Sequence, residues 1–330
     1  MKKTRKSGIS RRSFLQGVSA LGGGAVFTSA GAGQAENVAP VLPHRVLGGT
    51  GREVSTIALG TAPCGQSKTV DTPTVTAIVN EALDLGVNYI DTARIYGNAE
   101  EGIGKALGGR REQVFLATKV WADNKAGARE SLDESLRTLR TDHVDLVFRH
   151  SMGNRDLHQA LAPDGALAYL LRQRDAGRTR FVGISGHSRV ESFVSVIESG
   201  EIDVVMMAMN FVDRHVYGFE EKVLPVARRH NVGVACMKVF GGVRGGFRNY
   251  GGPNPGPQMD SEFLPQAVRY ALGLPGVATL VIGPHTVEQL RQNVQWVTDY
   301  RPLSAHEQET LTRFGRQFSG QWGPHYGPVA

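Results

Sequence analysis

The chain has 330 residues, which is enough for one large domain or two ordinary ones. Its formal net charge of +6 arises from six basic residues that precede the first acidic residue, Glu36. From Glu36 onward 37 − 6 = 31 basic residues face 31 acidic ones, which argues against nucleic acid or another polyanion as a partner. The two cysteines, Cys64 and Cys236, exclude a disulfide framework, and we expect free thiols, with a single bridge as the alternative.

Residues 1–35 resemble a twin-arginine export signal. SRRSFL (10–15) follows a basic start, and a weakly apolar, glycine-rich stretch leads to small residues near Ala32 and Ala35. This stretch is shorter than the ~20 apolar residues that span a bilayer, so we expect no stable membrane insertion. The pattern predicts a cleaved signal peptide, the twin-arginine translocase as a partner during export, and a periplasmic protein. A disordered basic tail is the alternative.

Residues 36–330 are expected to form a single domain, in which short apolar runs alternate with segments of helical periodicity. Before the first of these apolar runs, residues 45–55 predict a β-hairpin that turns at Gly48–Gly49 and covers the bottom of the fold. Strands are predicted at 57–62, 89–92, 114–119, 144–150, 181–185, 204–210, 232–239 and 279–283. Helices are predicted near 72–86, 99–108, 126–140, 164–177, 189–199, 219–230, 261–273 and 286–297.

Eight strand–helix pairs in this order predict an α/β fold, the (β/α)8 TIM barrel, with an N-terminal β-hairpin. A doubly wound open sheet is the alternative, but LGTAPCGQ (59–66) is a poor match to its glycine-rich phosphate turn. The segment 241–258, rich in glycine and proline, follows the seventh strand. We expect it to be a mobile flap over a bound cofactor, with a solvated connector as the alternative.

Polar groups close three successive predicted strands: Asp91 with Tyr96 just beyond it, then Lys119, then His150. In a barrel these strand ends converge on one rim, so the four side chains are expected to meet. An ammonium stabilises a neighbouring phenolate, and a carboxylate keeps that ammonium charged. Such a group of side chains can deliver a proton to a carbonyl oxygen but supplies no electrons, so a hydride carrier is required.

The motifs that contain these residues resemble those of aldo-keto reductases, over about 45–297. They are IDTARIYGNAEEGIGKAL (90–107), FLATKVW (115–121), SLDESLRTLRTDHVDLVFRH (131–150), FVGISGH (181–187) and VIGPHTVEQLRQN (281–293). The resemblance implies that Tyr96 is the general acid, that Lys119 tunes its pKa, and that Asp91 pairs with Lys119. It further implies that His150 orients the carbonyl group and that Trp121 contacts the substrate.

The resemblance also implies NADP(H) as the cofactor, with NAD(H) as the alternative. The residues expected to bind it are Thr61, Ser185, Lys238, Gly241, Gly283, His285, Gln289 and Asn293. Several positions depart from the family pattern. Gly186, Met206 and Met237 replace an asparagine, a glutamine and an aromatic residue, and His285 and Gln289 replace a lysine and an arginine. Because the arginine is lost, we expect weaker binding of a 2′-phosphate. NADPH, NADH and flavin therefore all remain alternatives for the cofactor.

The sequence therefore predicts an exported NAD(P)H-dependent oxidoreductase that reduces small aldehydes or ketones to alcohols. One alternative is a nicotinamide-binding barrel that acts as a redox sensor or partner subunit with little turnover. Another is a barrel lyase or isomerase without a hydride carrier. The remaining histidines lack metal-ligand spacing, so no metal is expected. The aromatic tail 318–330 is expected either to line the pocket through Trp322 or Tyr326, or to be a frayed terminus.

Overall fold

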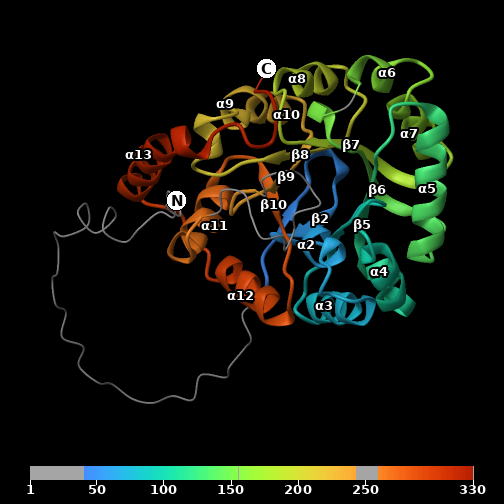
Figure 1. Ribbon diagram of the computed structural model, residues 1–330, viewed down its shortest axis with the longest axis horizontal. Helices are drawn as coiled ribbons and strands as arrows, with labels where there is room; N and C mark the ends of the chain where they lie inside the picture. Colours follow the sequence, from blue (N-terminus) through green and yellow to red (C-terminus); the bar gives the residue numbers. More distant parts are fainter. Residues whose placement is uncertain (1–40, 155, 243–258, 330) are drawn as a thin grey trace, which may run out of the picture.

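The computed structural model describes residues 41–154, 156–242 and 259–329, and its centre is a closed barrel of eight parallel strands (Figure 1). The strands are β3 Ile57–Gly60, β4 Tyr89–Asp91, β5 Phe115–Val120, β6 Val144–Arg149, β7 Thr179–Gly186, β8 Val204–Ala208, β9 Gly233–Met237 and β10 Val277–Ile282. They follow one another around the ring, and β10 pairs with β3 to close it. The predicted (β/α)8 barrel is confirmed, and the open sheet is wrong. The predicted signal peptide (1–35) and most of the predicted flap (243–258) lie outside the described residues.

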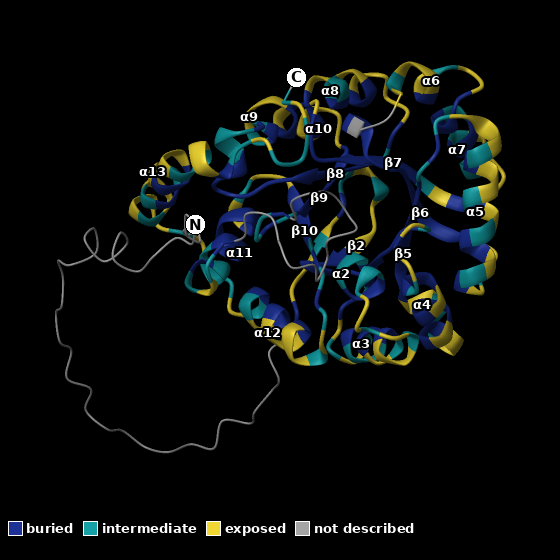
Figure 2. Ribbon diagram, in the orientation of Figure 1, coloured by how far each residue is buried: buried dark blue, intermediate teal, exposed yellow. Residues whose placement is uncertain are grey.

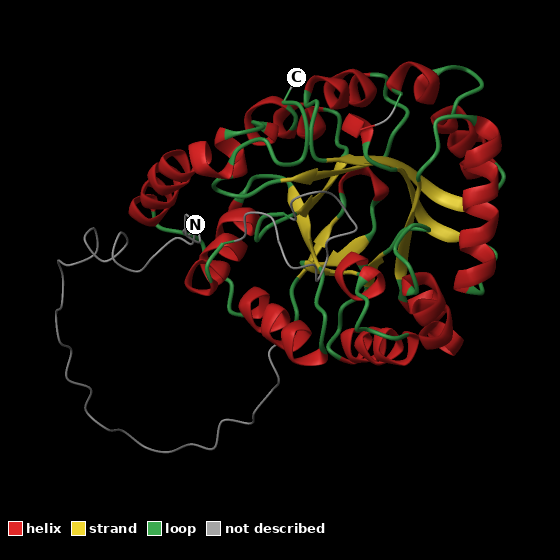
Figure 3. Ribbon diagram, in the orientation of Figure 1, coloured by secondary structure: helices red, strands yellow, loops and turns green. Residues whose placement is uncertain are grey.

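Helices surround the barrel on all sides in Figure 3. Those in predicted positions are α3 Thr72–Asp84, α4 Ala99–Leu107, α5 Lys125–Leu139, α7 Ala166–Asp175, α8 Glu191–Glu198, α11 Leu264–Gly273 and α12 Val287–Thr298. The single helix predicted at 219–230 is in fact two, α9 Phe219–Lys222 and α10 Leu224–Arg229, because Pro225 starts a new first turn. The sequence did not predict α2 Ala62–Gln66, α6 Leu157–Leu161 or α13 Ala305–Trp322.

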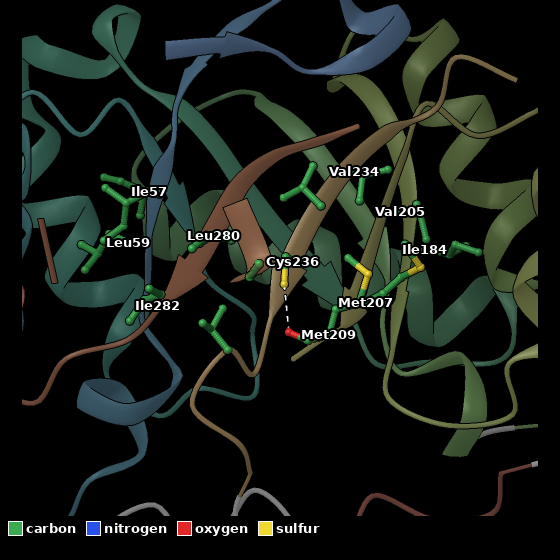
Figure 4. Close-up of a cluster of buried hydrophobic side chains, with 14 of the residues drawn as sticks. Ile57, Leu59, Ile184, Val205, Met207, Met209, Val234, Cys236, Leu280 and Ile282 are labelled. Atoms are coloured by element: carbon green, nitrogen blue, oxygen red, sulfur yellow. Dashed lines mark hydrogen bonds between the residues drawn. The ribbon is translucent and has the colours of Figure 1, made fainter. Parts of the chain in front are cut away.

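Alternation along each strand divides the core into two layers, and both are buried in Figure 2. Residues such as Ala58, Met206 and Ala235 point into the barrel, while their neighbours pack against the helices. Figure 4 shows the outer layer, where the Cys236 thiol donates a hydrogen bond to the Met209 carbonyl oxygen (3.2 Å). Cys64 is also buried and unpaired, so the prediction of two free thiols is confirmed.

The predicted hairpin is present, and it covers the amino-terminal end of the barrel. Strand β1 His44–Val46 pairs with β2 Glu53–Ser55, and the side chains of Leu47 and Val54 join the inner barrel core. Gly48 has φ +51°, and a Cβ there would lie 2.4 Å from the backbone nitrogen of Gly233. Only glycine allows the hairpin to approach the barrel so closely.

Three strands, β3, β8 and β9, end two residues earlier than the apolar runs predict. Strand β8 stops at Ala208 instead of Asn210, and β9 stops at Met237. Lys238 then adopts φ +60°, a left-handed conformation that costs a non-glycine residue about 1–2 kcal/mol. The chain therefore turns at the barrel rim, where Lys238 lines a cavity that it shares with Tyr96.

Helix α13 begins with a capping box: the Ser304 side chain accepts from the backbone of Glu307, and the Glu307 side chain accepts from the backbone of Ser304. Glu307 also accepts two hydrogen bonds from the Arg269 guanidinium of α11, at 2.7 and 3.0 Å. Together these donors lower the pKa of Glu307 to about 2.

None of the helices in the described part of the chain combines the length and apolar character needed to cross a membrane.

We expect Glu307→Gln to lower the free energy of unfolding by about 1 kcal/mol near neutral pH, because the charge-assisted pair with Arg269 is lost at a partly exposed site, whereas a glutamine can still accept from the Ser304 backbone. The folded-state pKa lies below the unfolded one, so this contribution is present above the unfolded value and disappears as pH falls toward the folded value of about 2. Urea unfolding at several pH values measures it. The exposed Glu309→Gln on the same helix is the control, and an equal loss in both variants would contradict this role of Glu307.

Candidate active site

Four predicted side chains meet at the carboxyl-terminal rim of the barrel. Asp91 is the last residue of β4, Tyr96 lies in the loop that follows, Lys119 lies near the end of β5, and His150 directly follows β6. All four are buried, with exposed fractions between 2% and 6%. Because β4, β5 and β6 are consecutive neighbours in the ring, the three strand ends bring these groups into contact.

The contacts connect the four groups in order. The Lys119 ammonium donates a short hydrogen bond to the Asp91 carboxylate and another to the Thr92 carbonyl oxygen (2.9 Å). Its Nζ lies 4.9 Å from the centre of the Tyr96 ring, and the Tyr96 hydroxyl lies 3.4 Å from Nε2 of His150. A phenol thus stands between a cation and an imidazole.

Burial sets the protonation of these groups. It lowers the pKa of Lys119 and raises the pKa of Asp91, and the attraction between the two opposes both shifts. For His150, burial followed by the nearby charge of Lys119 holds the pKa well below its usual range. His150 is therefore neutral at physiological pH, with one ring nitrogen as donor and the other as acceptor.

The surroundings of His150 are also fixed. The Trp121 ring packs against it edge-on, with ring centres 5.1 Å apart. Arg149, fully buried, donates to the His150 carbonyl oxygen and to the Asp123 carboxylate (2.8 Å). Arg149 thereby ties the end of β6 to the loop after β5, which carries Trp121. Trp121 contacts His150 but does not line the cavity that Asp91 and Tyr96 line.

A cavity of about 490 Å³ opens from these groups, a size typical of cofactor and small-molecule sites. Asp91 and Tyr96 line one end of it. Six of the predicted cofactor-binding residues also line it, namely Lys238, Gly241, Gly283, His285, Gln289 and Asn293. Residues from β4, β9, β10 and α12, far apart in sequence, therefore line one space.

The other two predicted cofactor residues, Thr61 and Ser185, are buried beside the site but do not line this cavity. The Thr61 hydroxyl donates to the Asp91 carbonyl oxygen (2.9 Å). The Ser185 hydroxyl oxygen accepts from the backbone nitrogen of Ser151 (3.4 Å), one residue beyond His150. Both therefore contact the backbone around the candidate catalytic groups.

The α12 end of the cavity is electrically neutral. Burial lowers the pKa of His285, and the Gln289 side-chain oxygen accepts from the His285 backbone nitrogen (2.7 Å). Arg291 pairs with Glu81 on α3 at 2.7 Å. Within the described residues, the first turns of α12 thus offer hydrogen-bond donors and acceptors to a ligand but direct no side-chain cation at the cavity.

The sequence did not single out His187, which lines the same cavity and is 5% exposed. Burial, together with the positive charges of Lys238 and Lys119, holds its pKa well below the usual range. The signal was present in FVGISGH, an apolar run that closes on an imidazole just as VDLVFRH does at His150. Apolar lining residues such as Phe240 and Trp296 were also missed.

This arrangement can protonate an oxygen on which negative charge develops. In such a reaction the Tyr96 hydroxyl would be the donor, the Lys119 cation would stabilise the resulting phenolate, and His150 would offer a neutral hydrogen-bonding nitrogen. Among the residues that the structure describes, no cluster of three or more His, Cys, Asp or Glu side chains could hold a metal ion.

Comparison with known proteins gives consistent matches. The family model described as "Aldo/keto reductase family" matches residues 56–266. L-galactose dehydrogenase of Arabidopsis thaliana is 28% identical over 81% of this chain and 92% of its own length. The holo form of aldo-keto reductase AKR11C1 from Bacillus halodurans superposes with a TM-score of 0.67 at 26% identity, over 82% of this chain and 96% of that one. An aldo/keto reductase from Klebsiella pneumoniae, solved with NADP and acetate, shares the fold (TM-score 0.66, 21% identity, 86% and 98% coverage).

We expect Asp91→Asn to lower the free energy of unfolding by about 3–5 kcal/mol, because the amide leaves Lys119 buried without a counter-charge. Urea unfolding measures the loss. Asp84→Asn is the matched control, since Asp84 pairs with Arg110 at the surface and such pairs contribute about 0–1 kcal/mol. Similar losses in the two variants would refute a stabilising role of the buried pair.

Proposed function

Because this chain belongs to the aldo/keto reductase family, we propose that it is an NAD(P)H-dependent oxidoreductase that reduces small aldehydes or ketones to alcohols. One observation carries the proposal. Tyr96, which contacts both Lys119 and His150, lines the same cavity as Lys238, Gly283 and Asn293. A proton donor and a space for a hydride carrier therefore adjoin, as carbonyl reduction requires.

NADP(H) is the proposed cofactor, and NAD(H) is the alternative. The cavity fits an elongated nucleotide, because it extends from Tyr96 past Lys238 and Gly241 to the start of α12. Gly283, His285, Gln289 and Asn293 would hold the end remote from Tyr96, while Thr61 and Ser185 support the end near it. When bound, the nicotinamide supplies the hydride.

The residues of the chain supply the proton and the geometry. Tyr96 donates its proton to the carbonyl oxygen of the substrate as negative charge develops there. Lys119, held in place by Asp91, stabilises the phenolate that remains. Neutral His150, in the tautomer that carries its hydrogen on Nε2, donates to the same oxygen and so orients the carbonyl group. Trp121, packed on His150, limits which substrates reach this point.

The proposed place of action is the periplasm, reached through the twin-arginine translocase. The support is SRRSFL (10–15) with the apolar stretch after it, together with a formally neutral remainder of the chain. That pathway carries folded proteins, so the cofactor would be loaded before export. Residues 36–330 then form the mature single-domain enzyme.

We expect Tyr96→Phe to reduce turnover of aldehydes by about 10²–10⁴-fold, the usual contribution of a general acid. Its affinity for NADPH should stay within about twofold of the wild type, because the ring and the cavity wall remain. Steady-state kinetics with a panel of aldehydes and fluorescence titration with NADPH and NADH measure the two quantities. Tyr169→Phe on α7, remote from the cavity, is the control and should retain full turnover.

Two outcomes would count against this proposal. Wild-type protein that binds a nicotinamide nucleotide tightly but turns over no carbonyl compound would favour the redox sensor or partner subunit. Protein that takes up no nucleotide at all would favour chemistry without a hydride carrier.

For export, we expect the double change Arg11→Lys and Arg12→Lys to retain the protein in the cytoplasm, because the arginine pair is the recognised element of such signals. Fractionation of cells that express the full chain, followed by mass determination of the mature protein, tests this. Lys2→Arg with Lys3→Arg, which preserves charge outside the arginine pair, is the control. Equal periplasmic yield from both variants would refute the signal.

A further inference from the structure

A buried carboxylate outside the catalytic group connects two chain segments that lie beside the cavity. Asp213 is 1% exposed and lies just after β8. Its Oδ2 accepts a hydrogen bond from the Asn210 side-chain nitrogen (2.6 Å), and its Oδ1 accepts one from the indole nitrogen of Trp322 (2.9 Å). Neither Asp213 nor Asn210 lines the cavity, so the proposed reaction does not use them directly.

The first connection leads to Lys238. The Asn210 side-chain nitrogen has two hydrogens, and besides Asp213 it donates to the Lys238 carbonyl oxygen (3.0 Å). The same carbonyl oxygen accepts from the backbone nitrogen of Gly241 (2.9 Å). These bonds offset the cost of the left-handed conformation of Lys238 and fix the turn that places Lys238 and Gly241 against the cavity.

The second connection leads to the C-terminal strap, which we define as residues 323–329. Trp322 ends α13 directly before the strap. Pro328 and Val329 accept hydrogen bonds through their carbonyl oxygens from the backbone nitrogens of Arg189 and Val190 (3.0 and 3.4 Å). The Tyr326 ring packs against His187, with ring centres 5.1 Å apart, and its backbone nitrogen donates to the Tyr217 hydroxyl (2.7 Å).

The strap also reaches the turn after β9. A Cβ added to Gly242 would lie 2.4 Å from the Tyr326 hydroxyl oxygen, so Tyr326 packs directly on this backbone. Through Tyr326 the strap therefore supports both His187 and the residue that follows Gly241. The two connections of Asp213 end on adjacent parts of one cavity wall.

We propose that Asp213 is a positioning residue, which holds the Lys238 turn and the C-terminal strap in the geometry that nucleotide binding requires. The nucleotide part of this inference rests on the function proposed above. A carboxylate suits the role because it accepts from both donors, whereas a neutral amide at this position would turn its own N–H groups toward one of them. Burial raises the pKa of Asp213 to about 7, while Asn210, Trp322 and the charge of Lys238 favour the ionised form. The other titratable groups that act on it are Tyr217, Glu220 and Cys236.

The test compares wild type and Asp213→Asn at a pH of about 8, where the wild-type carboxylate is ionised. Hydrogen exchange should accelerate at the amides of Gly241, Arg189, Val190 and Tyr326, which report the turn and the strap. The Kd for NADPH should rise about tenfold, the typical result of one lost buried hydrogen bond, while kcat stays within about twofold. Trp322→Phe, which removes the indole donor, should accelerate exchange in the strap and leave the Gly241 amide unchanged.

Glu220→Gln is the matched control, because Glu220 is also a buried carboxyl whose pKa is raised to about 7, yet it bonds to Tyr270 away from the cavity. Equal changes in Glu220→Gln and Asp213→Asn would mean a general loss of stability and overturn the proposal. Unchanged exchange at all four amides in Asp213→Asn would overturn it as well. If wild type binds no nucleotide, the proposed function fails, and the exchange comparison still decides whether Asp213 positions these segments.

Discussion

The buried ion pair between Lys119 and Asp91 is the interaction on which the site depends. Removing two charges from water costs several kcal/mol of desolvation free energy for each charge. Only close pairing and further hydrogen bonds offset that cost. Here the ammonium reaches both the carboxylate and the Thr92 carbonyl oxygen. The pair stabilises the fold only weakly relative to an apolar substitute, so its presence at the end of an otherwise apolar strand indicates a chemical use.

The barrel makes this pairing possible. Strands β4 and β5 are parallel neighbours, so Asp91 and Lys119 project from the same rim. The opposite end is filled by aromatic rings, Tyr89 against Phe115 and Phe115 against Phe181, and is covered by Leu47 of the hairpin. Because side chains fill the lower barrel, a ligand can approach Tyr96 only from the rim where the loops and the strap lie.

The strand–helix order and the four polar groups could be predicted because each leaves a local mark in the sequence. Buried strands read as apolar runs, and a lysine or carboxylate that closes such a run is costly enough to be informative. The local sequence does not indicate the left-handed backbone turn at Lys238. The apolar run ends at Met237, but Val239 follows Lys238, so the pattern predicted a strand as far as residue 239, whereas the left-handed turn depends on Asn210, 28 positions earlier in the chain.

Helix α13 illustrates a different limit. Its capping signal, Ser304 followed by Glu307, was visible, but few apolar residues follow, and Gly315 lies in its interior. In the structure Gly315 is required, since a Cβ there would lie 1.8 Å from the Phe211 carbonyl oxygen. The helix is specified by close packing on the segment after β8 and by Arg269, and a single-sequence pattern contains neither contact.

The electrostatic properties of the cavity depend on the buried groups near Tyr96 and on Lys238. Near Tyr96, a fixed cation and its partner carboxylate are buried together, and the neutral imidazoles of His150 and His187 adjoin them. Among the lining residues that the structure describes, Lys238 is the one lysine or arginine. A nucleotide that carries negative phosphates would therefore depend strongly on where Lys238 is held. That position is set by a backbone turn, and the turn is held by Asn210 and Asp213, so within the described part of the chain a buried network outside the cavity lining positions the cation that faces the cavity.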